Sequence, residues 1–156
     1  MTGGGDQPRW LDSEEMRAWR AFVVGKALLD AQLNRELQDE HQLTLADYEL
    51  LVRLSEASCG QVRMSTLAEQ VGSSKSRISH QIGRMEKAGL ARRQECPGDR
   101  RGVFAVLTDH GLEVLRSAAP THLRGVRDNL IDLLSGQERL VLADIFERVQ
   151  SHLRER

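Results

Sequence analysis

Cysteine is scarce in this chain: among 156 residues, only Cys59 and Cys96 occur. Two cysteines do not form the disulfide framework that stabilises small secreted domains, which favours a reducing compartment. Long apolar runs are missing too, because none approaches the roughly 18 residues of a membrane-spanning helix. Residues 1–10 also lack the apolar stretch of a signal peptide. We therefore expect a cytoplasmic protein that does not cross a membrane.

Groupings of catalytic or metal-ligating residues are missing as well. The five histidines show no His-x-x-x-His spacing, and neither cysteine has a CxxC partner, which argues against a structural metal. Residues 72–76 (GSSKS) resemble the end of a phosphate-binding loop, but Ser74 stands where that motif has glycine. No nucleophile and base occur together. We therefore expect no enzyme activity and no cofactor or metal.

Positive charge is concentrated in one segment. The whole chain has 22 Lys and Arg against 23 Asp and Glu, a net charge of -1. Between residues 73 and 102, however, eight basic residues face three acidic ones, a net of +5. The basic residues are Lys75, Arg77, Arg84, Lys87, Arg92, Arg93, Arg100 and Arg101. Such a local excess is typical of a surface that neutralises phosphates.

The same segment shows the order of a winged helix-turn-helix over residues 64–108: a short helix, a turn, a second helix and two strands. We expect Ser65 to cap the first helix and Gly72 to end it, since a left-handed residue suits a helix C-terminus. Ser73 or Ser74 is expected to cap the second helix.

The second helix has two different faces. Ile78, Ile82 and Met85 stand at i, i+4 and i+7 and therefore share one apolar side. In a recognition helix, the N-terminal half of the opposite side enters the DNA major groove. The residues expected to face base edges are Ser74, Ser76, Arg77 and His80, and those expected nearer to phosphates are Lys75, Arg84 and Lys87. A solvated basic face is the alternative, which the adjoining hairpin disfavours.

A basic hairpin follows this helix. Strands are expected at 91–95 and 103–107, with a turn at Pro97-Gly98 and a tip formed by Asp99-Arg100-Arg101-Gly102. Beside a recognition helix, such a hairpin can enter the adjacent minor groove, where arginine exploits the negative potential of narrow A·T-rich tracts. The alternative is a solvated hairpin with an i,i+2 ion pair that contributes little energy.

These motifs resemble the MarR family of bacterial transcriptional regulators. The resemblance is carried by Met64–Leu67 with Ala68 and Val71, by Arg84–Leu90 with Arg93, and by Asp99-Arg100-Arg101 leading to Leu107-Thr108. The flanking run LTLADYELLVRLSE (43–56) and the later helices resemble the family too. The resemblance implies a wing in which Arg101 reaches the minor groove and Asp99 braces it.

The resemblance also implies a place for an effector. Many relatives bind small aromatic or phenolic anions between the dimer layer and the winged helix. Trp19, Tyr48 and Arg53 would suit such a ligand, although core packing explains the aromatics equally well. The peroxide-sensing branch has a cysteine in its first helix, which this chain lacks, and Cys96 is favoured as a spectator.

Long amphipathic helices flank the winged helix. Ser13 is expected to cap the first, and Pro120 is expected to kink or break the stretch from 109 to about 134 near residues 118–121. Ser135 and Glu138 form a capping box that opens a last helix. Spare apolar faces at both ends of the chain predict a dimerisation layer, with a monomer as the alternative.

Together these patterns predict a mainly α fold with a small β-hairpin wing (α+β). We expect a disordered lead (1–10) and one domain (11–156), with the winged helix at about 44–108 and dimerisation helices at about 12–40 and 109–154. The predicted function is a homodimeric transcriptional regulator, favoured as a repressor, that binds an inverted repeat in double-stranded DNA. A winged-helix protein-interaction module is the alternative, and an enzyme ranks third.

Overall fold

The computed structural model describes residues 8–96 and 98–156, apart from the side chains of Cys96, Asp99, Arg100 and Arg101. Most of the predicted disordered lead falls outside these residues. The elements are α1 (Ser13–His41), α2 (Leu45–Glu56), η1 (Ser58–Gly60), β1 (Gln61–Arg63), α3 (Met64–Gln70), α4 (Lys75–Lys87), β2 (Ala91–Cys96), β3 (Asp99–Leu107), α5 (Asp109–Asn129), η2 (Ile131–Leu133) and α6 (Gly136–Arg154). The predicted fold class, helical with a small β wing, is confirmed.

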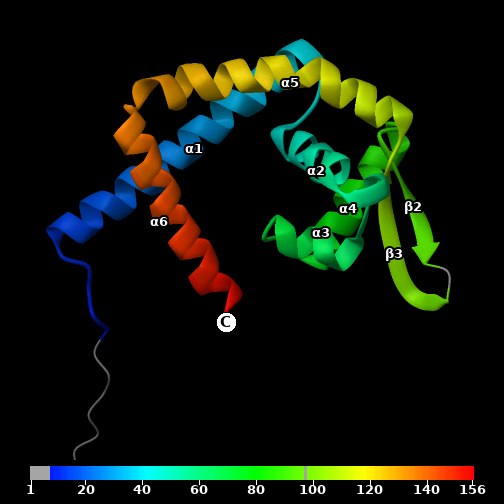
Figure 1. The fold of residues 1–156 in the computed structure, drawn as a ribbon, viewed down its shortest axis with the longest axis horizontal. Helices are drawn as coiled ribbons and strands as arrows, with labels where there is room; N and C mark the ends of the chain where they lie inside the picture. Colours follow the sequence, from blue (N-terminus) through cyan, green and yellow to red (C-terminus); the bar gives the residue numbers. More distant parts are fainter. Residues whose placement is uncertain (1–7, 97) are drawn as a thin grey trace, which may run out of the picture.

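Two long helices, α1 and α5, flank the winged helix. Figure 1 shows α5 running beside α1, with α2, α3, α4 and the sheet gathered below one end and α6 turning back at the other. The core is built mainly from leucines: Leu33 and Leu37 of α1 pack with the fully buried Leu50, Leu51 and Leu54 of α2. This core determines the positions of α4 and the wing.

The wing is longer than the sequence predicts. The sheet has the order β1-β3-β2 and is antiparallel throughout, with the pairing Arg93↔Ala105 in the wing and Val62↔Ala105 on the other side of β3. The expected tip at 99–102 is wrong, because Cys96 already pairs with Asp99 and residues 99–102 belong to β3. Gly98 has a φ of +85°, a conformation that suits a short turn between β2 and β3.

Most predicted helix ends are confirmed, and two caps are wrong. Ser74, one of the two serines that the sequence predicts as caps, caps α4, and Thr44 caps α2. Asp12 rather than Ser13 caps α1, because its carboxylate accepts two backbone N–H groups in a capping box. Ser65 does not cap α3, since that helix already begins at Met64 and Ser65 lies within it.

The sequence predicts a kink or a break near Pro120; the break is wrong, because α5 runs unbroken through this residue. The neighbouring residues hold the helix in place: Ala118 is fully buried, and Thr121 donates a hydrogen bond of 2.8 Å to Glu40 of α1. The Nε2 atom of His41 also lies 2.8 Å from the Thr121 hydroxyl. Contacts with α1 therefore outweigh the one backbone hydrogen bond that proline removes.

Helices α1 and α6 carry apolar side chains that the described part of the chain leaves uncovered. On α1 they are Trp19, Phe22, Val23, Val24 and Leu28, and on α6 they are Leu140, Val141, Ile145, Val149 and Leu153. No residue of α6 is buried. Among the described helices, none has the length and apolarity that crossing a bilayer requires.

Candidate nucleic-acid interface

The two faces predicted for α4 are observed. Ile78, Ile82 and Met85 are at most 1% exposed and anchor the helix in the core. The opposite face is solvent-exposed and carries Lys75, Ser76, Arg77, His80, Arg84 and Lys87. The hydroxyl of Ser74 accepts the backbone N–H of Arg77 at 3.1 Å, so this predicted base-reading residue already serves as the helix cap.

Helix α2 holds α4 from one side through Asp47. The amide of Gln81, which is buried, donates a hydrogen bond of 3.0 Å to the Asp47 carboxylate. The guanidinium of Arg84 lies 3.7 Å from the same oxygen. Arg84 is therefore partly neutralised before any partner arrives. Sequence reasoning missed this contact because Asp47 and Gln81 lie 34 residues apart.

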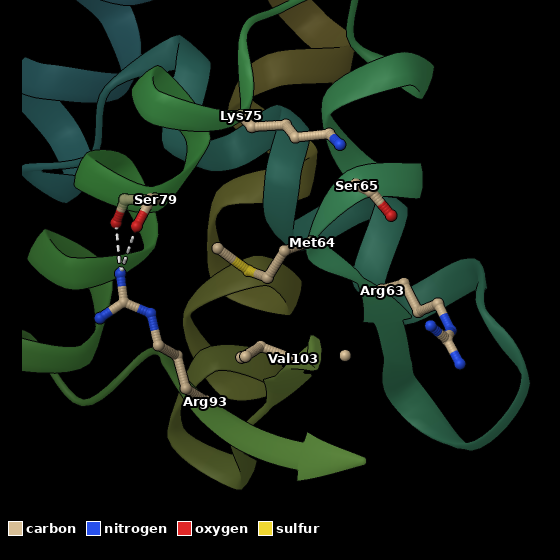
Figure 2. Close-up of a pocket in the computed structure, with 8 residues that line it drawn as sticks. Arg63, Met64, Ser65, Lys75, Ser79, Arg93 and Val103 are labelled. Carbon is tan, nitrogen blue, oxygen red and sulfur yellow. Dashed lines mark hydrogen bonds between the residues drawn. The ribbon is translucent and has the colours of Figure 1, made fainter. Parts of the chain in front are cut away.

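Strand β2 holds α4 from the other side through Arg93. Its backbone N–H and its Nη1 donate to the Glu86 carboxylate at 2.8 and 3.0 Å. Its Nη2 donates to the Ser79 carbonyl at 2.5 Å and lies 3.1 Å from the Ser79 hydroxyl, as Figure 2 shows. The sequence places Arg93 in the basic segment and in the motif Arg84–Leu90 with Arg93, and it predicts no partner for this side chain. The available signal for this ion pair was the presence of opposite charges, Glu86 and Arg93, on either side of the helix end at Gly89-Leu90.

A pocket of about 350 Å³ lies between α4, the wing and the start of α3. Lys75 reaches it from α4 and Ser65 from α3, while Val103 belongs to the wing strand β3 (Figure 2). Arg63 also lines it, with its guanidinium carbon 5.6 Å from the centre of the Phe104 ring. None of the described residues that line this pocket is acidic, so its field favours an anion.

The predicted wing residues can be placed only by their backbone. Asp99, Arg100 and Arg101 lie at the start of β3, next to the turn. Their side chains are outside the part of the chain that the structure describes. The braced arginine therefore stays a prediction.

The three residues expected at an effector site are not all together. Tyr48 and Arg53 line a pocket of about 540 Å³ with Lys26 and His122. Trp19 lies elsewhere: its ring packs 6.0 Å from that of Phe22, which in turn lies 5.2 Å from Phe146 of α6. The sequence could not separate these aromatics because α1 is long enough to reach both places.

Burial shapes the chemistry of this second pocket. The rings of Tyr48 and His122 lie 4.4 Å apart. Burial lowers the pKa of His122, against an opposing effect of Glu36, and it raises the pKa of Tyr48. Burial also raises the pKa of Glu49 on the same wall. Within the described residues, the Nδ1 atom of His122 has no hydrogen-bond partner, and no cluster of three or more potential metal ligands occurs.

Known proteins resemble this chain in both fold and sequence. Residues 43–103 match the model of the MarR family. The regulator AbsC of Streptomyces coelicolor is 48% identical, with a TM-score of 0.88 over 96% of this chain and 100% of AbsC. Sco3205 of the same organism, solved in complex with DNA, is 41% identical, with a TM-score of 0.89 over 96% of this chain and 93% of Sco3205.

A relative with a curated description agrees. The HTH-type transcriptional regulator PecS of Dickeya dadantii (strain 3937) is 26% identical over 144 residues, which cover 92% of this chain and 86% of PecS. The likeness therefore spans the flanking helices as well as the winged helix. This chain belongs to the MarR family and is a DNA-binding winged-helix transcriptional regulator.

Proposed function

We propose that the protein is a homodimeric repressor that binds an inverted-repeat operator through α4 and the wing. The observation that carries the proposal is the exposed basic face of α4, which the buried side chains of Ile78, Ile82 and Met85 orient outward. Such a helix fits the major groove, which is wide enough to admit it. The related Sco3205, solved in complex with DNA, supports this mode of action.

Within α4, position along the helix assigns the roles. Ser76, Arg77 and His80 lie in the N-terminal half and face base edges, whereas Lys87 at the C-terminal end faces a phosphate. Arg84 has to leave Asp47, 3.7 Å away, in order to bind a phosphate. Its contribution to affinity is therefore smaller than that of Lys87.

The pocket between α4 and the wing receives the DNA backbone. A strand that leaves the major groove at α4 and enters the minor groove at the wing passes between these elements. Lys75 supplies a charge there and Ser65 a hydroxyl. The wing side chains Asp99, Arg100 and Arg101 then meet the minor groove, with Arg101 inserted into it.

The uncovered faces of α1 and α6 form the dimer interface. A two-fold axis through them would place the two copies of α4 about 34 Å apart, which corresponds to one turn of DNA. No other part of the described chain offers apolar surface of similar extent on two neighbouring helices. Each half of an inverted repeat then meets one winged helix.

The second pocket is the site of a small aromatic anion that releases the DNA. Tyr48 and His122 provide aromatic walls, and Lys26 and Arg53 provide positive charge beside the acidic Glu49 and Glu56. A bound anion would compete with Asp30 for Lys26 and with Glu56 for Arg53. Trp19 is not part of this site in a single chain. Because Asp47 directly precedes Tyr48 and holds α4 through Gln81, a ligand that moves Tyr48 acts on the recognition helix.

Selection of bound sequences from a random duplex pool tests the proposal. We expect an enriched inverted repeat, and a complex of two chains with one duplex in sedimentation. Enrichment of single half-sites would contradict the dimer. If nothing is enriched, sequence-specific DNA binding fails and the protein-interaction module becomes the better interpretation.

Repression and release need a separate measurement. The wild-type protein should silence a reporter gene placed behind the selected sequence. Addition of a phenolic acid should restore expression of that gene. The variants Arg53→Gln and Lys26→Gln should reduce the response to the acid while DNA affinity stays unchanged. Activation of the reporter by the protein would overturn the repressor assignment.

A further inference from the structure

We propose that Arg93 is a positioning residue that sets the orientation of α4 relative to the wing, and that it is not a phosphate ligand. The inference rests on the proposed DNA-binding function and adds a residue to it. Its basis is the set of contacts that join the β2 side chain of Arg93 to two separate points of α4, at Ser79 and Glu86.

The two contact points span the recognition helix. Ser79 and Glu86 are seven residues apart, which is about two helical turns. The guanidinium donates to the Ser79 carbonyl at 2.5 Å and to the Glu86 carboxylate at 3.0 Å, and the Arg93 backbone N–H adds a third bond of 2.8 Å to Glu86. Contacts at two points fix the tilt of a helix, which a single contact cannot do.

A small residue makes room for the guanidinium. Gly83 lies between Ser79 and Glu86 on the same side of α4, and a Cβ atom added there would lie 3.6 Å from Nη2 of Arg93. The planar group therefore lies against the backbone of the helix at Gly83. Lysine would not reproduce this arrangement, because its ammonium is a point charge without a planar fork.

Arg93 lines the pocket that we propose for the DNA backbone, with a side chain that is 37% exposed, but the same contacts reduce its availability to DNA. Both terminal nitrogens of the guanidinium donate within the protein, and the positive charge is paired with Glu86 at 3.0 Å. A phosphate would have to replace charge-assisted bonds that already exist. Arg92, the preceding residue, differs: its guanidinium donates only along its own strand, to Gln94 at 3.0 Å, among the bonds described.

Orientation matters because α4 and the wing engage different grooves. If α4 tilts, the base contacts of the helix and the minor-groove contact of the wing can no longer form together. General attraction to phosphates does not depend on this angle. Loss of the Arg93 contacts should therefore weaken operator binding more than binding to random DNA.

The test compares Arg93→Gln with the control Arg92→Gln. Affinities for the selected operator and for a random duplex are measured over a range of salt concentrations. For Arg93→Gln we expect the ratio of operator to random affinity to fall roughly tenfold, as charge-assisted bonds of this kind warrant. We expect the dependence on salt to match the wild type. For Arg92→Gln the ratio should be unchanged.

Two results would overturn the proposal. If Arg93 were a phosphate ligand, Arg93→Gln would lower the slope of log affinity against log salt by about one unit and leave the ratio of operator to random affinity unchanged. A residue that serves only stability would lower both affinities by the same factor. The variant Glu86→Gln adds a check: a pure charge effect predicts tighter DNA binding, whereas the positioning role predicts weaker operator binding.

Hydrogen exchange of the DNA-free protein separates this inference from the proposed function. Amides of α4 should exchange faster in Arg93→Gln than in the wild type, while those of α2 and α5 should not change. Unchanged exchange in α4 would refute the positioning role even if the protein binds its operator. A wild-type protein that binds no duplex would refute the proposed function and leave the exchange result intact.

Discussion

Arg77 and Arg84 lie about two turns apart on α4 and meet different surroundings. Arg84 lies 3.7 Å from the Asp47 carboxylate, which is itself largely shielded from solvent. Arg77 is exposed and sits one turn after the Ser74 cap. Two residues of the same type therefore differ in availability: one is partly paired within the protein, and the other is exposed to solvent, where a partner can reach it.

Arg77→Ala should reduce sequence discrimination. An arginine that forks onto guanine contributes roughly 1–3 kcal/mol of preference for the correct base. We expect the affinity for the selected operator to fall by about that amount while random DNA is bound almost as before. Fluorescence anisotropy on both duplexes measures the difference. Equal losses on both would show that Arg77 contacts a phosphate instead.

Asp99→Ala and Arg101→Ala test the wing. If Asp99 holds the Arg101 side chain ready, its loss restores an ordering cost of about 0.5–1.5 kcal/mol on binding and weakens the complex. A pure charge model predicts tighter binding. Arg101→Ala should weaken binding further, most strongly on A·T-flanked operators, because narrow minor grooves reward the inserted cation.

Affinities on A·T-flanked and G·C-flanked duplexes decide between these interpretations of the wing. Tighter binding by Asp99→Ala would remove the bracing role. An Arg101→Ala loss that does not depend on the flanks would leave the wing as a diffuse positive surface.

His122 should make the stability of the fold depend on pH. Burial lowers its pKa below the ordinary value of 6.5, so the unfolded chain takes up a proton first as the pH falls. Stability is therefore lost from about pH 6.5 down to the folded pKa. Between about pH 7.5 and about pH 5.5, the melting temperature of the wild type should drop more than that of His122→Phe.

The nearby Glu49 acts with the opposite sign. Because the pKa of Glu49 is raised in the folded state, stability is lost as the pH rises from the ordinary value of 4.5 through that higher pKa. Measurements should therefore stay above that range. If the melting temperatures of the wild type and His122→Phe fall by the same amount over this pH range, His122 is excluded as the source of the pH dependence.

At the scale of secondary-structure elements, one close approach joins α5 to the winged helix. A Cβ atom added at Gly111, in the first turn of α5, would lie 2.0 Å from the Leu90 carbonyl oxygen and 2.9 Å from a Leu107 methyl. Thr108 reinforces the junction, since its hydroxyl donates to the Gly89 carbonyl at 2.6 Å and accepts the Gly111 N–H at 2.9 Å. This junction fixes how the long helix leaves the wing.

Gly111→Ala should destabilise the fold by about 1–3 kcal/mol, because a backbone carbonyl cannot move aside for the added methyl group. Gly136→Ala is the matched control: its Cβ would meet only the Arg139 side chain, at 3.9 Å, in the first turn of α6. Urea denaturation should separate the two variants. Equal stabilities would show that the α5 junction yields easily.

At the scale of the whole molecule, the apolar faces of α1 and α6 are exposed in the single chain and form the proposed dimer interface. Val149→Glu places a charge in the α6 stripe at a side chain that is 45% exposed in the single chain, so the protomer should still fold. We expect a monomer in sedimentation at micromolar concentration, with helical content retained. Ser151→Glu, on another side of α6, should stay dimeric.

Deletion of residues 137–156 should likewise give a monomeric or aggregating product. A truncated chain or a Val149→Glu variant that remains a stable dimer would contradict the proposed interface. The point variant is the more informative of the two, because it changes one side chain and leaves the rest of α6 in place.

Much of the fold could be predicted because it depends on neighbours within a few residues. The caps Thr44, Ser74 and Ser135 bond to backbone groups three residues ahead, and Gly72 and Gly89 have φ values of +63° and +73° at helix ends. Sequence also misled locally, as at Asp12 and Ser13, because two good capping residues were adjacent and both could start the helix.

The sequence by itself determined the order of the elements, the buried face of α4 and the concentration of basic residues beside it. These features follow from side-chain period and local hydrogen bonding, which a linear pattern records. Only the tertiary structure decided which of those basic residues remain available. It pairs Arg93 with Glu86, brings Arg84 near Asp47 and separates Trp19 from Tyr48. The physical reason is that the field at a charged group depends on partners that packing brings together across the chain.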